Sequence, residues 1–461
     1  MTHIKSPNSG MDLFFAKMDT QGLKLTYADL RFHTDLSNVM PSDVNLRTRF
    51  SRRIELLIPL ASAAMDTVTE SSMAIALASN GGIGVIHKNM TPEAQAAKVQ
   101  RVKLHLNGLI PHPTTANASE TLAHILSRRE AEQLSFHSFP VLKEGKLVGL
   151  LTQNDFDFQP DRETLVEEAM TPLANLITAP KGTSIDEAYV ITRREKRKIL
   201  PLVDDDGGIA GLYVFADLQR GKSNESMHNI DSRGHLRVAA AVGVGEGALV
   251  RAVLLAEKGC DAFVIDTAHG DSANVHNTIR QLKELYSDID IVAGNVSRAT
   301  AAKRLAEAGA DAVIVGQGGG SICTTRVVTG IGCPQASAVY DCVKTLRGTD
   351  IPVIADGGIV NPGDIVIALG LGAESVILGR LLAGAQEAPG DEVTVAGARM
   401  KEYRGMASEA ALRENAGSRE RYRQTKGSGR RLVAEGVEAL IPHTGTRRRR
   451  WKNFSEEWRT D

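Results

Sequence analysis

The chain has 461 residues, more than one hydrophobic core usually serves, so we expect a large domain and a smaller second module. Its 42% hydrophobic and 24% charged residues are typical of a soluble α/β protein and exclude a disordered or fibrous one. The 54 Lys and Arg residues nearly balance the 55 Asp and Glu residues, and the net charge of -1 excludes a global field that would recruit nucleic acid or an anionic membrane. A small molecule is therefore the expected partner.

The cysteines and the first residues bear on the compartment. Cys260, Cys323, Cys333 and Cys342 are widely spaced, which favours neither a disulfide framework nor a zinc site. The opening MTHIKSPNSG carries no apolar stretch behind a basic start, and no apolar run reaches membrane-spanning length. We therefore expect reduced thiols, no membrane partner and a cytoplasmic location.

Apolar runs predict the strands of the large domain. Between Thr20 and Met90 they are IELLIPLASAAMD and GGIGVIHKN, each ending in small, polar or turn-forming residues. From Asp261 onward one unit repeats, a β-branched run, a turn and an Ala-rich amphipathic stretch, most plainly at 301–316 and 364–379. This alternation predicts a parallel sheet. Because no G-x-G-x-x-G follows an early strand, we expect a (β/α)8 TIM barrel rather than a Rossmann domain.

An internal repeat interrupts this pattern between about Leu106 and Lys222. Its copies are FPVLKEGKLVGLLTQNDF (139–156) and LPLVDDDGGIAGLYVFADL (200–218). The insert resembles a tandem pair of CBS modules (a Bateman module), which implies an adenine or guanine nucleotide in the cleft between the two copies. A structural spacer fits the residues equally well. We expect residues 1–105 and 223–461 to form the barrel and residues 106–222 to form the inserted module.

The glycine-rich stretch VGQGGGSICTTR (315–326) is the candidate for chemistry. It follows the predicted strand DAVIV, and catalytic loops of such barrels follow the strands at their carboxyl ends. Its glycines allow close approach of the backbone to a ligand, and Ser321, Thr324 and Thr325 place hydroxyls beside Cys323. Most free cysteines are simply small buried residues. Here the flanks and Arg326, which can stabilise a thiolate, favour a nucleophile.

Specific motifs carry a resemblance to a known family. They are SAAMDTVTE (62–70), GGIGVIHKNM (81–90), IDTAHGD (265–271), AGNV (293–296), GGGSICTTR (318–326), TGIGCPQ (329–335), ADGGI (355–359) and YRGMAS (403–408). From about Leu23 to Gly445 the chain resembles the inosine monophosphate dehydrogenase and guanosine monophosphate reductase family, whose dehydrogenases carry a tandem CBS insert at the same place. The resemblance implies homotetramers, or octamers paired through the CBS modules.

The resemblance implies a covalent mechanism. Cys323 would add to C2 of a purine nucleotide and Thr325 would handle water or ammonia. In the dehydrogenase, hydride leaves C2 for NAD, and the remaining thioimidate is hydrolysed by water that Arg421 and Tyr422 activate from a mobile flap. An ordinary guanidinium stays protonated, so this role of Arg421 comes from the family alone.

The resemblance also implies the binding residues. Phosphate would be held by Ser321, Gly358, Gly379, Arg380 and Tyr403, and paired glycine-rich loops after late strands suit such a site independently. Asp356 would bind the ribose hydroxyls, although an Asp at this place is also a common helix N-cap. The remaining expected sets are Met65, Gly405, Met406 and Glu435 for substrate, Asp266, Thr267, Asn295, Gly316 and Gly318 for NAD, and the carbonyls of Gly318, Gly320 and Cys323 for potassium.

Two features separate the two activities of the family. Glu409 stands where reductases carry a catalytic Glu, and with Thr325 it would protonate departing ammonia, with NADP as the cofactor. A solvated helix residue is the usual fate of such a Glu. The segment 421–445, with Arg421, Tyr422 and Gln424, resembles the dehydrogenase flap. Together with the CBS insert and IDTAHG, it favours IMP dehydrogenase, with GMP reductase as the alternative.

Further departures and a different class of function stay open. Gln317 and Gly319 replace the Ile and Pro often seen in the family's loop, which is expected to loosen it, and Arg447 to Arg450 lie in an atypical C-terminal segment and are expected to be solvated. A CBS-containing nucleotide sensor with an inactive barrel is a second alternative, against which Cys323 and Arg421 speak. A flavin-dependent barrel enzyme is a third, because paired phosphate loops also suit that cofactor.

Overall fold

The computed structural model describes residues 9–33, 36, 38–40, 43–106, 109–110, 113–131, 137–223, 227–414, 416–422 and 433–445. The chain forms two compact units, residues 1–103 with 227–461, and residues 104–226. The sequence predicts the second unit at residues 106–222, so its expected limits lie two and four residues inside the observed ones.

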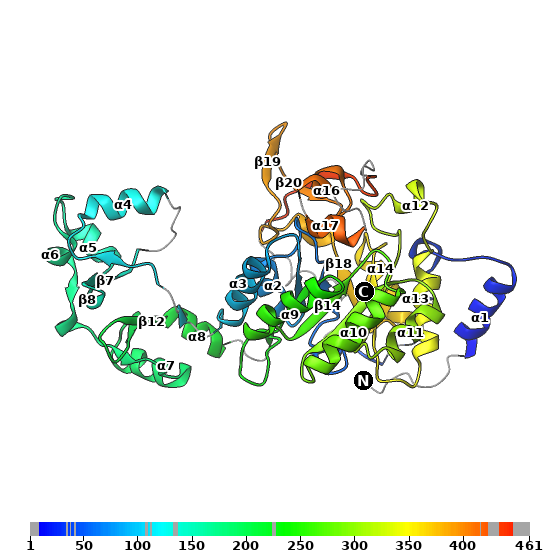
Figure 1. Cartoon of the computed structure of the whole chain (residues 1–461), viewed down its shortest axis with the longest axis horizontal. Coiled ribbons are helices and arrows are strands. Elements are labelled where there is room, and N and C mark those ends of the chain that lie inside the picture. The colour runs from blue at the N-terminus through cyan, green and yellow to red at the C-terminus, as the bar shows by residue number, and fades with distance from the viewer. Residues whose placement is uncertain are drawn as a thin grey trace. The chain divides into compact units, whose positions relative to one another are not determined.

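Eight parallel strands close into a barrel in the first unit (Figure 1). Their order around the barrel is β13 (Val238–Val242), β14 (Ala262–Asp266), β15 (Asp290–Val296), β16 (Ala312–Val315), β17 (Val353–Asp356), β18 (Ser375–Leu378), β3 (Leu60–Ser62) and β4 (Ile83–Ile86). Every neighbouring pair is parallel. The predicted (β/α)8 barrel is therefore confirmed.

A helix follows each strand. The helices are α2 (Ser71–Ala78), α3 (Pro92–Lys103), α9 (Glu246–Glu257), α10 (Ala273–Leu285), α11 (Ala299–Glu307), α12 (Thr325–Val328), α13 (Gln335–Leu346), α14 (Pro362–Gly370) and the short α15 (Arg380–Ala383). Gly309 and Gly372, with φ of +106° and +101°, turn the chain sharply after α11 and α14, which glycine does without steric penalty. The repeated helix, glycine and apolar strand of the sequence are thus the repeated unit of the barrel.

The amino ends of the strands are closed by a short hairpin, β1 (Thr48–Arg49) with β2 (Glu55–Leu56). Its Phe50, Ile54 and Leu56 are at most 2% exposed and pack with the small and branched residues of the barrel interior. Ser51 Oγ donates a hydrogen bond to Asp290, at the start of β15. Because packing fills this end, the carboxyl ends of the strands remain for a binding site.

Further elements lie at those carboxyl ends. Strands β19 (Glu392–Val395), β20 (Ala398–Arg404) and β21 (Glu438–Pro442) form an antiparallel sheet, and α16 (Glu409–Glu414) and α17 (Ala416–Arg421) follow β20. Figure 1 shows these elements, in orange to red, on one side of the barrel. They bring the C-terminal part of the chain over the strand ends.

The second unit contains two sheets of the same design. One has the order β6 (Ala116–Asn117), β7 (Phe139–Lys143), β8 (Lys146–Leu151) and β9 (Thr171–Pro172), and the other has β10 (Ala179–Pro180), β11 (Ile199–Val203), β12 (Ile209–Val214) and β5 (Leu109–Ile110). In each, one parallel pair is followed by two antiparallel pairs. The helices are α4 (Leu122–Ala131), α5 (Gln153–Phe158), α6 (Val166–Ala169), α7 (Ile185–Arg194) and α8 (Phe215–Ser223), and each sheet has its own apolar core. The two copies of the sequence repeat therefore form equivalent substructures.

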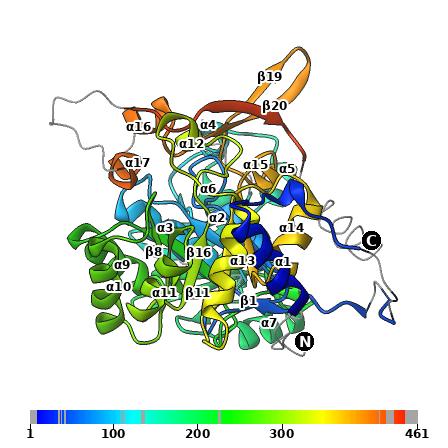
Figure 2. The same cartoon turned by 90° about the vertical axis from the view of Figure 1, so that its right-hand side faces the viewer.

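The N-terminal helix packs on the outside of the first unit. Figure 2 shows α1 (Ser9–Thr20) beside α13, where the Phe15 ring stacks on Tyr340 at 3.9 Å between centroids.

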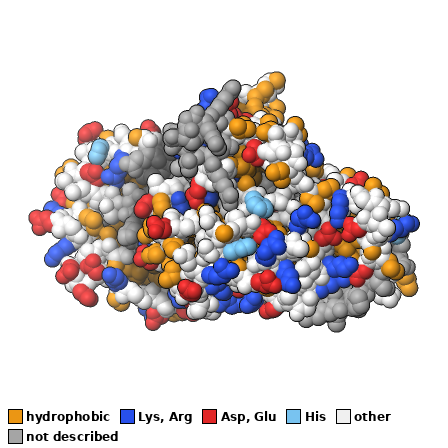
Figure 3. All heavy atoms as spheres, turned by 45° about the vertical axis from the view of Figure 1, so that its right-hand side comes forward, with side chains coloured by type: hydrophobic (Ala, Val, Ile, Leu, Met, Phe, Trp, Pro, Cys, Tyr) orange, Lys and Arg blue, Asp and Glu red, His pale blue; other side chains and the backbone are white. Residues whose placement is uncertain are grey.

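Acidic and basic side chains are mixed over the face of the molecule in Figure 3, as the net charge near zero leads one to expect. In the described ranges no helix has the length and apolarity needed to cross a bilayer.

Candidate active site

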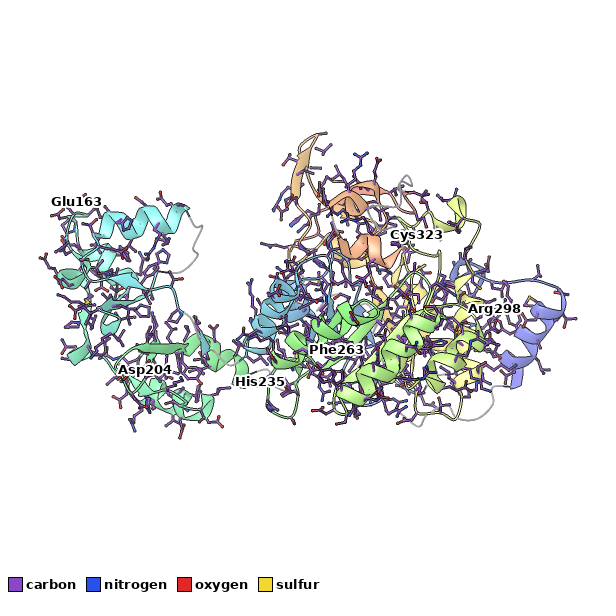
Figure 4. The ribbon with its side chains drawn as sticks, viewed as in Figure 1. Glu163, Asp204, His235, Phe263, Arg298 and Cys323 are labelled. Atoms are coloured by element: carbon purple, nitrogen blue, oxygen red, sulfur yellow. The ribbon has the colours of Figure 1, made fainter. Side chains whose placement is uncertain are left out.

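A cavity opens at the carboxyl ends of the barrel strands. It is lined by the segments after five of them, by Asn295 of β15, by residues of β20 and α17, and by Glu435 and Gly436 before β21. In Figure 4, Cys323 lies among these loops, on the side of α16 and α17, whereas Phe263 of β14 lies in the body of the barrel. The predicted site residues on its wall are Cys323, Thr325, Arg421, Tyr422, Met65, Ser321, Asp356, Gly358, Gly379, Arg380, Tyr403, Gly405, Met406, Glu435, Asp266, Thr267, Asn295, Gly316, Gly318 and Gly320. The structure thus brings together residues from distant parts of the chain.

The loop after β16 presents the thiol. Its first glycine, Gly316, has φ of +151°, and a Cβ there would lie 1.8 Å from the carbonyl oxygen of Asp356, so only glycine fits. Gln335 supports the loop from below, donating from Nε2 to the carbonyls of Val315 at 2.8 Å and Asp356 at 3.1 Å. The half-buried Cys323 places Sγ 3.2 Å from the hydroxyl of Thr325, at the start of α12. This thiol and hydroxyl therefore act at one place in the cavity.

The segment before β21 holds the thiol loop in place through backbone hydrogen bonds. Thr324 N–H donates to the Glu435 carbonyl at 2.9 Å, and Val437 N–H donates to the Ile322 carbonyl at 3.0 Å. A Cβ on Gly436 would come within 3.3 Å of that same Ile322 oxygen. The glycine at this position lets the two segments approach closely.

Two glycine loops and one tyrosine form the predicted phosphate corner. Gly357 and Gly358 have φ of +93° and +78°, and a Cβ on Gly379 would lie 2.9 Å from the Tyr403 hydroxyl oxygen. Tyr403 is 4% exposed. Burial raises its pKa, against a hydrogen bond with Ser321 that lowers it, so the phenol remains a neutral donor for an anion at physiological pH.

Asp356 ends β17 and faces the cavity. Asn295 Nδ2 donates to its Oδ2 at 2.7 Å and to the Gly316 carbonyl at 2.9 Å. Burial raises the pKa of Asp356, while the Asn295 hydrogen bond lowers it. The alternative of a helix N-cap does not apply, because Asn361 caps α14.

Arg421 and Tyr422 enter the cavity from the end of α17. Arg421 Nη1 donates to Asp266 Oδ2 at 2.7 Å, and its guanidinium carbon lies 5.9 Å from the centroid of the Tyr422 ring. Burial would lower the pKa of Arg421, but the Asp266 carboxylate and other negative groups leave it raised, and burial raises the pKa of Tyr422 to about 12. In this arrangement Arg421 stays protonated and positively charged, and Tyr422 stays a neutral phenol.

The residues that hold α17 against the barrel were not singled out from the sequence. Asn89, in the loop after β4, donates from Nδ2 to the buried Ser418 Oγ at 2.9 Å. Glu420 accepts from the Val244 N–H at 3.3 Å, and its Oε2 lies 4.0 Å from the ammonium of Lys88, which is 2% exposed. A charged residue directly after the apolar strand of GGIGVIHKNM was the available signal.

Glu409 is the predicted site residue that lies away from the cavity wall. It begins α16 with its side chain 66% exposed and pairs with Arg413 one turn later. The solvated position weighed in the sequence is the one observed. Gln424 of the flap and Arg447 to Arg450 lie outside the described residues.

The structure also describes Gln317 and the loop whose carbonyls are expected to bind a cation. Contrary to the expected loosening, Gln317 adds hydrogen bonds to the loop, for example from Nε2 to the Ala268 carbonyl at 3.1 Å. The Gly320 carbonyl accepts from the Cys323 N–H at 3.1 Å, so this part of the loop forms a tight turn. No group of three or more His, Cys, Asp or Glu side chains suited to a metal ion occurs in the described part of the chain, and a cation here would use carbonyls.

Comparisons with known proteins identify the family of the chain. The sequence pattern of the IMP dehydrogenase / GMP reductase domain matches residues 24–458. Inosine-5'-monophosphate dehydrogenase of Halalkalibacterium halodurans is 44% identical over 425 residues, 91% of this chain and 85% of the relative, and that of Aquifex aeolicus is 45% identical over 424 residues with the same coverage. The crystal structure of a GMP reductase variant from Trypanosoma brucei with guanosine 5'-monophosphate has a TM-score of 0.81 at 36% identity, covering 96% of this chain and 92% of that one. The chain therefore belongs to the IMP dehydrogenase / GMP reductase family.

Proposed function

We propose that the protein is an IMP dehydrogenase, converting IMP, NAD and water into XMP and NADH. The observation that carries the proposal is the convergence of Arg421 and Tyr422 on the cavity that holds Cys323 and Thr325. The relatives at 43–45% identity over 91% of the chain, which are named as IMP dehydrogenases, support the same activity.

The positions of these side chains suggest which step of the reaction each one serves. Cys323 Sγ adds to C2 of the purine, while Asp356 accepts hydrogen bonds from the ribose hydroxyls and Tyr403 donates to the phosphate. Thr267 and Asn295, on the cavity wall, would hold NAD, which would supply the acceptor for the hydride that leaves C2. What remains is a thioimidate on Cys323, and water must attack it.

Arg421 and Tyr422 serve that second half of the reaction. Because its pKa is raised beside Asp266, Arg421 acts in this arrangement by stabilising negative charge on the attacking water, and Tyr422 orients that water through its hydroxyl. The water oxygen bonds to C2, the bond from C2 to Sγ breaks, and transfer of the water's proton to the departing Cys323 sulfur completes XMP formation and restores the thiol. Thr325, 3.2 Å from Sγ, is placed to relay that proton.

GMP reductase is the second candidate, converting GMP and NADPH into IMP, ammonia and NADP. The solved structures of the Trypanosoma brucei enzyme favour it, at 36% identity and a TM-score of 0.81. That reaction needs a proton donor for the leaving ammonia. Glu409, the donor expected from the sequence, is 66% exposed and paired with Arg413, so the relay from Glu409 to Thr325 is not assembled here.

The decisive assay measures NADH appearance from IMP and NAD with potassium present, and in parallel NADPH loss from GMP. The dehydrogenase predicts the first activity, abolished in Cys323→Ala and retained in Cys333→Ala, whose thiol does not line the cavity. Activity with GMP alone would make the protein a reductase. A nucleotide sensor with an inactive barrel would show neither activity and would form no adduct at Cys323.

Further properties are proposed on the family's pattern. Potassium would bind the carbonyls of Gly318, Gly320 and Cys323, which belong to one short loop with a turn between Gly320 and Cys323 and a positive φ at Gly318. Residues 106–222 would be a tandem CBS module that binds an adenine or guanine nucleotide, supported by the two equivalent sheets. We further propose a cytoplasmic homotetramer or octamer without nucleic-acid or membrane partners.

A further inference from the structure

Gln317 occupies the corner where three loops of the cavity meet. It follows Gly316, where the chain leaves β16, and it lies between the loops after β14 and β15. Its side chain is half-buried and forms part of the cavity wall. The residues around this corner include Asn295, Gly316 and Gly318, which are expected to bind NAD.

The Gln317 amide is engaged at both ends. Its Nε2 donates to the carbonyls of Ala268 at 3.1 Å and Asn295 at 3.3 Å and lies 3.4 Å from His269 Nδ1. Its Oε1 accepts from the Ser297 hydroxyl at 2.6 Å. One side chain thus links the loop that carries Cys323 to the two preceding strand ends.

The backbone of Gln317 adds another connection. Its carbonyl accepts from the Cys333 N–H at 3.2 Å, in the segment between α12 and α13. The amide side chain and the carbonyl together hold three separate segments at fixed distances from the thiol loop. The Ile often seen at this position in the family has neither a donor nor an acceptor, so a member with that residue cannot form these side-chain hydrogen bonds.

We propose that Gln317 is a positioning residue for the nicotinamide end of the cofactor. It acts through Ala268 and Asn295. Asn295 is itself one of the residues expected to bind NAD, and Ala268 directly follows another, Thr267. By fixing that wall relative to Cys323, it sets where the hydride acceptor stands over C2 of the purine. The proposal rests on the proposed dehydrogenase function, because it takes NAD as the occupant.

The test is NAD binding without turnover. NAD is titrated calorimetrically into full-length Cys323→Ala protein saturated with IMP, with and without Gln317→Ile. Loss of the two donated hydrogen bonds should weaken NAD binding about tenfold, with IMP affinity unchanged. Gln317→Glu keeps an acceptor for Ser297 but sets carboxylate oxygens against the carbonyls of Ala268 and Asn295, so it should weaken NAD binding further.

The control is Gln281→Ile, the same substitution at an exposed position of α10 away from the cavity wall, and it should leave NAD binding unchanged. Unchanged NAD affinity in Gln317→Ile would overturn the proposal, as would equal weakening of NAD and IMP, which is the mark of a general structural role. If Gln317→Ile does not fold, Gln317→Glu and Ser297→Ala give the same comparison. If the parent binds no NAD, the proposed function fails, and the same variants with NADPH then decide the role of Gln317.

Discussion

Arg421 and Asp266 form an ion pair at 2.7 Å across the mouth of the barrel, with side chains 14% and 8% exposed. Asp266 is the last residue of β14, and Arg421 is the last residue of α17. The two residues are 155 positions apart in the sequence. Asp266 is also one of the residues expected to bind NAD. Arg421 takes up acceptor capacity of Oδ2 that the cofactor would otherwise use, so the two partners compete for Asp266 in this arrangement.

Arg421→Ala should separate the two halves of the reaction. Hydride transfer needs Cys323 and the cofactor, whereas hydrolysis needs Arg421, so we expect a burst of NADH followed by steady turnover reduced about 100-fold. Rapid-mixing absorbance measurements resolve the burst. Arg399→Ala, at an exposed arginine of β20, should retain both phases. Loss of the burst itself would assign Arg421 to hydride transfer or binding instead.

Gly243→Ala should displace α17 from outside the cavity. A Cβ there would lie 1.9 Å from Glu420 Oε1, so the Glu420 side chain must leave its hydrogen bond with the Val244 N–H, and α17 loses a contact next to Arg421. We expect a lower kcat, by about tenfold, together with a lower KM for NAD, because Arg421 competes less for Asp266.

The matched control for Gly243→Ala is Gly247→Ala. Gly247 lies in α9, where a Cβ meets nothing within 4 Å. The alanine should leave the kinetics unchanged and stabilise the helix by about 0.5–1 kcal/mol. If both variants have the same kinetics, Glu420 does not control the position of Arg421.

Lys88 should give the folded state a distinct pH dependence. Burial lowers its pKa, against the opposing charges of Glu420 and Asp266. Between the lowered pKa and 10.5 the unfolded chain binds more protons at Lys88 than the native state does, so the free energy of unfolding gains a term that rises with pH. Lys88→Met removes this term. The stability of Lys88→Met relative to the parent should decline from pH 7 toward pH 10, which urea unfolding at a series of pH values measures. A difference that stays constant with pH would contradict the lowered pKa of Lys88.

Glu409→Gln should leave IMP-dependent NADH formation within about twofold of the parent. The side chain is 66% exposed and pairs with Arg413, and surface changes of this kind have small effects. Steady-state kinetics with IMP and NAD measures this. A large loss would show that α16 turns Glu409 into the cavity during the reaction, and a loss confined to NADPH consumption with GMP would favour the reductase.

The barrel and most of its site could be predicted because the relevant information is local. A helix, a glycine with positive φ and an apolar strand recur at 301–316 and 364–379, and each unit forms largely from its own residues. Carboxyl ends of parallel strands meet on one face, so Asp266, Asp356 and the loop with Cys323 were bound to share that face once a barrel was expected. The side chains on the wall followed from their places after the strands.

Contacts between distant segments needed the folded chain. The pairing of Arg421 with Asp266 and the approach of Glu420 to Lys88 depend on where α17 docks, and no local pattern encodes that position. The same reason explains why Glu409 turns outward, and why Gln317 gains partners on two other loops where the sequence suggested a looser loop. Residue types and their periodicity determine which elements form and which side chains stand at their ends. Hydrogen bonds and charge pairs across the barrel arise only when packing brings those ends within a few ångströms of one another, and only the tertiary structure decides which of them form.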